Sequence, residues 1–156
     1  MFNNHYHERK MGRGFAYMNN NDTKIQTYFL DENKYRDILG HTITTGNICN
    51  RNFYIDENNC LSYNGRYPGV FHIFSNFTFE SINEGPQNYS FCLFKNGIPI
   101  ESTITNITTL HNNSKNAGFS IFENIRTGDT LDLKVKNNNS MANIIVTSYN
   151  ITIIEL

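Results

Sequence analysis

Turn-forming residues interrupt the sequence at intervals of about 8 to 14 residues from His41 onward. The clusters, which are rich in Asn, Gly and Asp, are Glu57-Asn58-Asn59, Asn64-Gly65, Glu84-Gly85-Pro86, Asn96-Gly97, residues 111–116, Thr127-Gly128-Asp129 and residues 137–139. This spacing leaves room for short strands and is too close for strands that alternate with helices. The sequence therefore predicts an all-β sandwich or barrel.

Asn96 and Gly97 stand between two short apolar runs in the stretch LFKNGIPI, residues 93–100. An Asn-Gly pair in this setting favours a type I′ hairpin turn, because both of its central residues need a positive φ. We also expect Gly128 and Asp129 to be critical for a turn, with the Asp129 side chain bonded to nearby backbone rather than acting as a catalytic acid. These stretches are therefore interpreted as scaffold.

Composition limits the possible partners. The chain has 156 residues, which fits one domain, and its 13 basic and 14 acidic residues are interspersed, so we expect neither nucleic acid nor an anionic membrane as a partner. The 26 Asn, 12 Phe and 9 Tyr suit turns and pleated strands, although an AT-rich genome also accounts for an Asn excess. We find no signal peptide and no stretch suited to membrane insertion, and therefore expect synthesis in the cytoplasm.

We divide the chain into a flexible N-terminal arm (residues 1–14), a β-rich lead-in segment (15–41) and a sandwich domain (42–156). The arm is polar and basic, with few side chains that could anchor it to a core. The predicted strands of the sandwich cover residues 42–49, 52–56, 60–63, 69–80, 88–95, 98–106, 117–125, 130–136, 143–148 and 149–156.

Two of these strands, 88–95 and 149–156, carry apolar side chains on both faces, whereas strand 130–136 alternates cleanly between apolar and polar residues. Antiparallel strands of an isolated sandwich need only one apolar face. The second face therefore contacts another subunit, or it is covered by the N-terminal segment. The candidate residues for a trimer interface or for the core are Tyr89, Phe91, Leu93, Phe94, Tyr149, Ile151 and Ile153.

The sequence gives little support for catalysis. His5 and His7 form the one close histidine pair, and their place in the polar arm favours a solvated or partner-contacting role over metal binding. Cys92 lies in an apolar stretch, where an inert buried thiol is the ordinary interpretation. Cys49 and Cys60 are expected to be thiols, although a bridge between them stays open. We therefore predict no enzymatic activity, no catalytic residue, no bound metal and no cofactor.

Three stretches resemble a known family. Residues 125–133, IRTGDTLDL, are similar to a strand pair with the pattern L-x-x-G-D-x-[VI]-x-L, and residues 93–100 resemble the central hairpin of the same family. Residues 69–75, GVFHIFS, stand where that family has an aromatic run. The family is the C1q/TNF-like jelly roll. The resemblance covers roughly residues 42–156. The collagen-like stalk of the animal proteins is absent. The resemblance is greatest to the short versions of the family in bacteriophages and large DNA viruses.

This resemblance implies an antiparallel jelly-roll sandwich of about ten strands that assembles as a homotrimer. It also implies a viral structural protein on the virion surface, as a minor capsid cap, a decoration protein or a fibre head. Other capsid or particle proteins would then be partners through residues 1–14. The alternative is a recognition module of an adhesin or tail fibre that binds a host receptor or glycan. A metal-dependent cupin-like enzyme is the third hypothesis.

Overall fold

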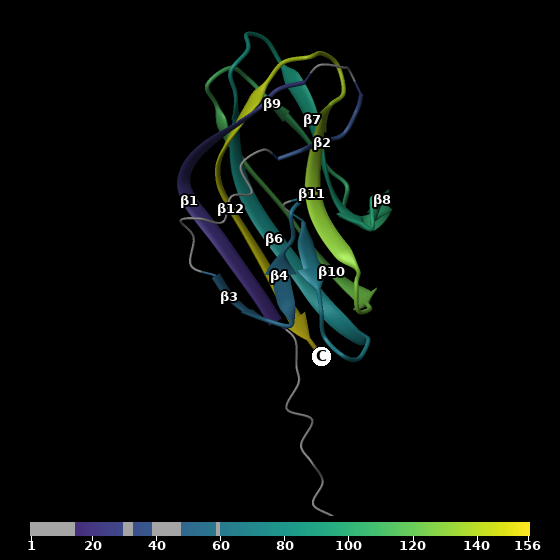
Figure 1. The fold of residues 1–156 in the computed structure, drawn as a ribbon. Coiled ribbons are helices and arrows are strands. Elements are labelled where there is room, and N and C mark those ends of the chain that lie inside the picture. Colours follow the sequence, from purple (N-terminus) through teal and green to yellow (C-terminus); the bar gives the residue numbers. More distant parts are fainter. Residues whose placement is uncertain (1–14, 30–32, 39–47, 59) are drawn as a thin grey trace, which may run out of the picture.

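The computed structural model describes residues 15–29, 33–38, 48–58 and 60–156, and they form two antiparallel β-sheets packed face to face (Figure 1). The strands are β1 (Phe15–Thr27), β2 (Arg36–Asp37), β3 (Ile48–Arg51), β4 (Phe53–Ile55), β5 (Leu61–Tyr63), β6 (Gly69–Ser81), β7 (Gln87–Lys95), β8 (Ile98–Pro99), β9 (Thr105–Thr109), β10 (Ser114–Ile125), β11 (Thr130–Asn137) and β12 (Ile144–Glu155). A single 3-10 turn spans Glu101–Thr103.

Sheet A has the strand order β10-β6-β12-β1-β3, and sheet B has the order β4-β5-β11-β7-β8. The short strand β2 pairs with β11, and β9 pairs with β7. Strands that neighbour each other in a sheet are mostly far apart in the sequence, because the chain crosses repeatedly between the two sheets. This is the connectivity of a jelly roll.

Alternating side chains explain why these strands stack. In β6 every second residue from Phe71 to Ser81 is buried, and the residues between them face outward from the sandwich. The strand β11 alternates in the same way, with Leu131, Leu133 and Val135 buried. A strand whose alternate side chains are buried has one apolar face, and that face is expected to pack against a second sheet.

The core divides into two aromatic clusters along the length of the sandwich. At one end Phe71 packs against Phe53, with ring centroids 5.6 Å apart and the rings nearly perpendicular. At the other end Phe79 packs against Tyr89 and Phe91, at 5.9 and 4.7 Å. Rings of this size each contribute roughly 2 to 3 kcal/mol when buried, so the aromatic content of the sequence is largely a core requirement.

Several predicted boundaries are corrected by the structure. The two predicted strands 143–148 and 149–156 are one continuous strand, β12 (Ile144–Glu155), with a register shift between Val146 and Ser148 where it pairs with β6. The predicted strand 98–106 is split into β8, the 3-10 turn and the start of β9. In the lead-in segment 15–41, β1 hydrogen-bonds between β12 and β3, so this part of the segment belongs to sheet A.

Asn96 and Gly97 form the turn between β7 and β8, with φ of 53° and 76°. Gly128 also has a positive φ, of 88°, and the Asp129 carboxylate accepts a 2.8 Å hydrogen bond from the backbone N–H of Arg126. Both turns therefore have the backbone that the sequence predicts, and Asp129 bonds to local backbone.

Candidate functional site: the outer face of sheet A

The outer face of sheet A carries side chains from β6, β10 and β12 in rows across the strands. One row runs from Phe122 through His72 to Ile154, and the next but one runs from Gly118 through Asn76 to Asn150. The first row places the His72 imidazole between two apolar side chains, and the second row is polar. The face therefore has two parts of different chemistry, which lie side by side along the same strands.

The apolar part is a cluster that we call the aromatic patch. The His72 ring lies 4.8 Å from the Phe122 ring and 5.5 Å from the Phe74 ring, measured between centroids. Phe122 is 66% exposed, and Val70 on β6 and Ile154 on β12 are also exposed. An imidazole nitrogen of His72 lies 2.8 Å from the Ser120 hydroxyl. The patch is defined as Val70, His72, Phe74, Phe122 and Ile154.

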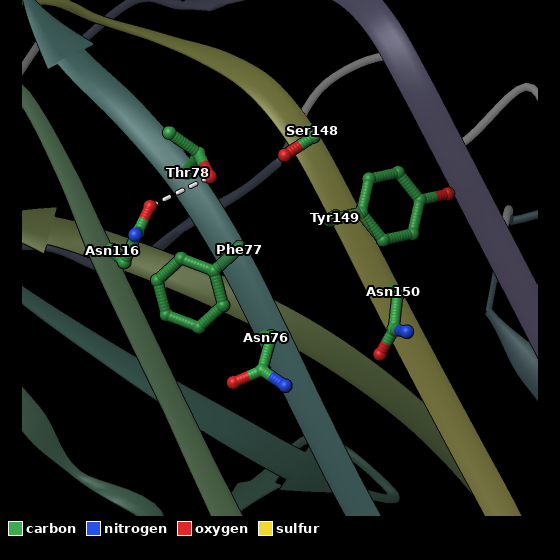
Figure 2. Close-up of a pocket in the computed structure, with 7 residues that line it drawn as sticks. All are labelled: Asn76, Phe77, Thr78, Asn116, Ser148, Tyr149 and Asn150. Atoms are coloured by element: carbon green, nitrogen blue, oxygen red, sulfur yellow. Dashed lines mark hydrogen bonds between the residues drawn. The ribbon is translucent and has the colours of Figure 1, made fainter.

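The polar part is a shallow hollow of about 330 Å³ that we call the amide recess (Figure 2). The Thr78 hydroxyl donates a 2.8 Å hydrogen bond to the side-chain oxygen of Asn116, which fixes the rim on the β10 side. The side-chain oxygen of Asn150 is buried and has no hydrogen-bond partner in the structure. The residues that line the recess are Asn76, Phe77, Thr78, Asn116, Ser148, Tyr149 and Asn150.

Gly118 makes room for the amide of Asn76. The two residues are direct partners in the β10–β6 ladder, and a Cβ atom at position 118 would lie 2.5 Å from the side-chain oxygen of Asn76 and 2.4 Å from the carbonyl oxygen of Ser75. Real Cβ atoms do not approach oxygen so closely. The glycine is therefore required for the local shape of this face.

The lining of the amide recess carries no charge. No Asp, Glu, Lys or Arg lines the recess, and in the described part of the chain no group of three or more His, Cys, Asp and Glu side chains is placed to hold a metal ion. The histidine pair His5 and His7 lies outside the described residues. What the outer face of sheet A offers is contact area and neutral hydrogen-bonding groups.

The outer face of sheet B is covered by the chain itself. The ring of Phe94, on β7, contacts the ring of Tyr35 edge to face at 5.0 Å, and the Lys134 ammonium lies 5.3 Å from the Phe94 centroid. Lys134 pairs with the carboxylates of Asp37 and Asp132. Burial favours the neutral amine of Lys134, but the hydrogen bonds to the two carboxylates outweigh that effect and raise its pKa.

These contacts decide between the two alternatives for the second face of β7. Tyr89, Phe91, Leu93, Phe94, Tyr149, Ile151 and Ile153 are all buried within the single chain. The second face of β7 is covered by the N-terminal segment at Tyr35, which is the alternative that the sequence left open. These seven residues are therefore core residues of one subunit, and they give no evidence for contact between subunits.

Two cysteines on sheet B are free thiols. Cys92 is fully buried, next to the Thr103 hydroxyl at 3.6 Å, which agrees with an inert structural role. Cys60 is partly exposed, and its pKa is raised to about 11 by burial and by the carboxylates of Asp132 and Asp56. A thiol that stays protonated at neutral pH is a poor nucleophile.

The sequence analysis did not select the aromatic patch, although a signal for it was present. In GVFHIFS the apolar residues Val70 and Phe74 lie on one face of the strand, and Phe71 and Ile73 lie on the other. This strand is therefore apolar on both faces over its first half, as β7 is. Only the structure distinguishes the two cases, because β7 is covered by the same chain and β6 is not.

Comparison with known proteins bears on the fold. No protein-family model matches the sequence, and no curated protein matches it. The structure is similar to Eiger TNF from S. frugiperda, with a TM-score of 0.54 and 9% identity over 93% of each chain. It is also similar to PRD1 vertex protein P5, with a TM-score of 0.54 and 11% identity over 92% of this chain and 96% of the other. The chain has a TNF-like jelly-roll fold.

In this TNF-like jelly roll both parts of the candidate site lie on sheet A. The first described residue, Phe15, pairs with Ile154 near the end of β12. Phe15 therefore lies beside Ile154 of the aromatic patch, at the same end of the sandwich. Among the described residues, no helix has the length and apolar character needed to cross a membrane.

Proposed function

We propose that this protein is a non-enzymatic structural component of a virus particle, a homotrimer displayed on the virion surface as a cap, decoration protein or fibre head. The fold supports a role in a particle, because PRD1 vertex protein P5 has a similar fold. At 11% sequence identity this likeness concerns the fold alone. The assignment therefore also depends on the properties of this chain.

The observation that carries the proposal is the aromatic patch. Phe122, Val70 and Ile154 are exposed on the adjacent strands β10, β6 and β12 of sheet A, around His72. On the outer face of sheet B, by contrast, Phe94 is covered by Tyr35 and Lys134. Contiguous exposed apolar surface on a folded domain marks an interface. Self-association through this face buries the patch. Identical subunits form closed symmetric assemblies, and the trimer is one of these.

Attachment to the particle is assigned to residues 1–14, which carry the basic residues Arg9, Lys10 and Arg13. The described part of the chain begins at Phe15, which pairs with Ile154 near the end of β12. A segment at this end can contact a larger shell while the loops of the opposite end point away from it. Other capsid or particle proteins are therefore the proposed partners of this segment.

Two measurements on the natural protein test this function. Mass spectrometry of purified particles from the source should find the chain as a virion component, and its absence from particles would overturn the structural assignment. Light scattering coupled to size exclusion should give the mass of three chains. A monomer at micromolar concentration would overturn the trimer.

A further inference from the structure

The sequence contains two Asn-Gly pairs, Asn64-Gly65 and Asn96-Gly97. Such a pair is chemically reactive, because the backbone nitrogen of the glycine can attack the side-chain carbonyl carbon of the asparagine, and glycine has no Cβ atom to hinder the approach. The new C–N bond closes a succinimide ring, and the side-chain nitrogen leaves as ammonia. Water then opens the ring and leaves an aspartyl or an isoaspartyl residue. The reaction consumes only water.

The two asparagines have similar surroundings along the main chain. The backbone N–H of Asn64 donates a 2.9 Å hydrogen bond to the carbonyl oxygen of Asn52, and that of Asn96 donates a 3.0 Å hydrogen bond to the carbonyl oxygen of Thr130. Both asparagines are exposed, so water can reach either of them. The restraint on the asparagine N–H and the access of water therefore do not distinguish the two pairs.

The side-chain amides of the two asparagines differ. The Asn96 amide is fixed at both ends, because its nitrogen donates to the Asp129 carboxylate and its oxygen accepts from the backbone N–H of Thr130, each at 2.8 Å. The Asn64 side chain makes no hydrogen bond to the described residues. Attack requires the side chain to turn until its carbonyl carbon faces the glycine nitrogen. For Asn96 this movement breaks two hydrogen bonds, one of them to a charged group, and for Asn64 it breaks none among the described residues.

We infer that Asn64 is a site of spontaneous deamidation in the folded protein, and that the hydrogen bonds of the Asn96 amide protect the second Asn-Gly pair from the same reaction. The modification replaces a neutral amide with a carboxylate in the loop between β5 and β6. It is independent of the proposed assembly and of the proposed attachment to a particle.

The isoaspartyl product is expected to damage the fold. It carries the main chain through the former side chain, and so lengthens the backbone by a carbon atom between positions 64 and 65. The loop has little room for this, because the space beside Gly65 is filled by the Tyr63 ring and the Gly65 carbonyl oxygen accepts a hydrogen bond from the Thr127 hydroxyl. The aspartyl product keeps the backbone unchanged at an exposed position, where substitutions cost little.

Incubation of the natural protein in mildly alkaline heavy-oxygen water tests the site. Ring opening places the heavy oxygen in the modified residue, and peptide mapping by mass spectrometry measures it at each position. In the folded protein Asn64 should convert at least about tenfold faster than Asn96, because its amide is not held. In chain unfolded by guanidinium chloride the two should convert at similar rates, since both precede glycine.

Two results of this incubation would overturn the inference. One is conversion of Asn96 in the folded protein as fast as that of Asn64. The other is an unmodified Asn64 in the folded protein after a period that converts the unfolded chain completely. Both measurements use the natural protein, so they do not depend on the folding of a variant.

Two variants test the protection and the damage separately. Asp129→Ala removes the acceptor of the Asn96 amide and should speed conversion of Asn96 at least about threefold without changing Asn64. An unchanged Asn96 rate would overturn the protection. Asn64→Gln keeps an amide but can close only a larger, slower-forming ring, so its melting temperature should survive an incubation that lowers that of the natural protein. Equal losses in the two proteins would overturn the assignment of the damage to Asn64.

Discussion

The side-chain amide of Asn96 donates a 2.8 Å hydrogen bond to the carboxylate of Asp129, and so joins the β7–β8 turn to the β10–β11 turn. The oxygen of the same amide accepts a 2.8 Å hydrogen bond from the backbone N–H of Thr130. Two residues that the sequence marks only as turn formers therefore hold neighbouring strands together at one end of the sandwich.

Gly97 permits this arrangement through its backbone rather than its size. Its φ is 76°, and a Cβ atom added there would meet nothing within 4 Å. Gly97→Val should therefore lower the free energy of unfolding by about 1 to 2 kcal/mol through backbone strain alone. Gly97→Asn is the control and should cost clearly less, because Asn tolerates positive φ. Chemical denaturation measures both, and equal losses would contradict the role of φ.

Gly118 should be intolerant of substitution for the opposite reason. Its added Cβ atom would lie 2.4 Å from the carbonyl oxygen of Ser75, which is backbone and cannot rotate away. Gly118→Ala should therefore destabilise the fold by roughly 1 to 3 kcal/mol, because β10 must shift away from β6. Thermal melting of the variant is compared with that of Asn116→Ala, which changes a residue two positions away on the same face. The comparison separates the effect of the clash from a general loss of contacts in the recess.

The fold was largely predictable from local signals, because turn residues at regular spacing and the alternation in 130–136 are read directly along the chain. The limits of β12 were not, since no Gly, Pro or Asp marks the register shift between Val146 and Ser148. Nor was the cover over Phe94 predictable in detail. Tyr35 is 59 positions away in the sequence, and only the pairing of β2 with β11 brings its segment to that face.

Cys60 should react slowly with alkylating reagents at neutral pH. Burial and the carboxylates of Asp132 and Asp56 raise its pKa to about 11, and the thiolate is the reactive form. Its rate with iodoacetamide should therefore keep rising through pH 9 and 10, whereas the same cysteine in unfolded chain levels off above about pH 9. Peptide mapping by mass spectrometry follows this site alone. A folded-state plateau near pH 9 would contradict the assigned surroundings.

Phe122 should matter for assembly and little for folding. It is 66% exposed in the single subunit, so Phe122→Ser should change the free energy of unfolding of the monomer by no more than about 0.5 kcal/mol. The same ring is the most exposed side chain of the aromatic patch, and its loss should weaken association at least about tenfold. Tyr54→Ser, at an exposed aromatic residue on sheet B, should leave association unchanged. Sedimentation at several concentrations distinguishes the two variants.

Residues 1–13 should serve attachment and not the trimer. Their large apolar side chains are those of Met1, Phe2, Tyr6 and Met11, which provide too little apolar area to offset the entropy of ordering these residues without a partner. Deleting them, while keeping β1 from Phe15, should leave trimer mass and melting temperature nearly unchanged and abolish incorporation into particles. Normal incorporation of the truncated protein would place attachment elsewhere. Loss of the trimer would instead assign these residues to the interface between subunits.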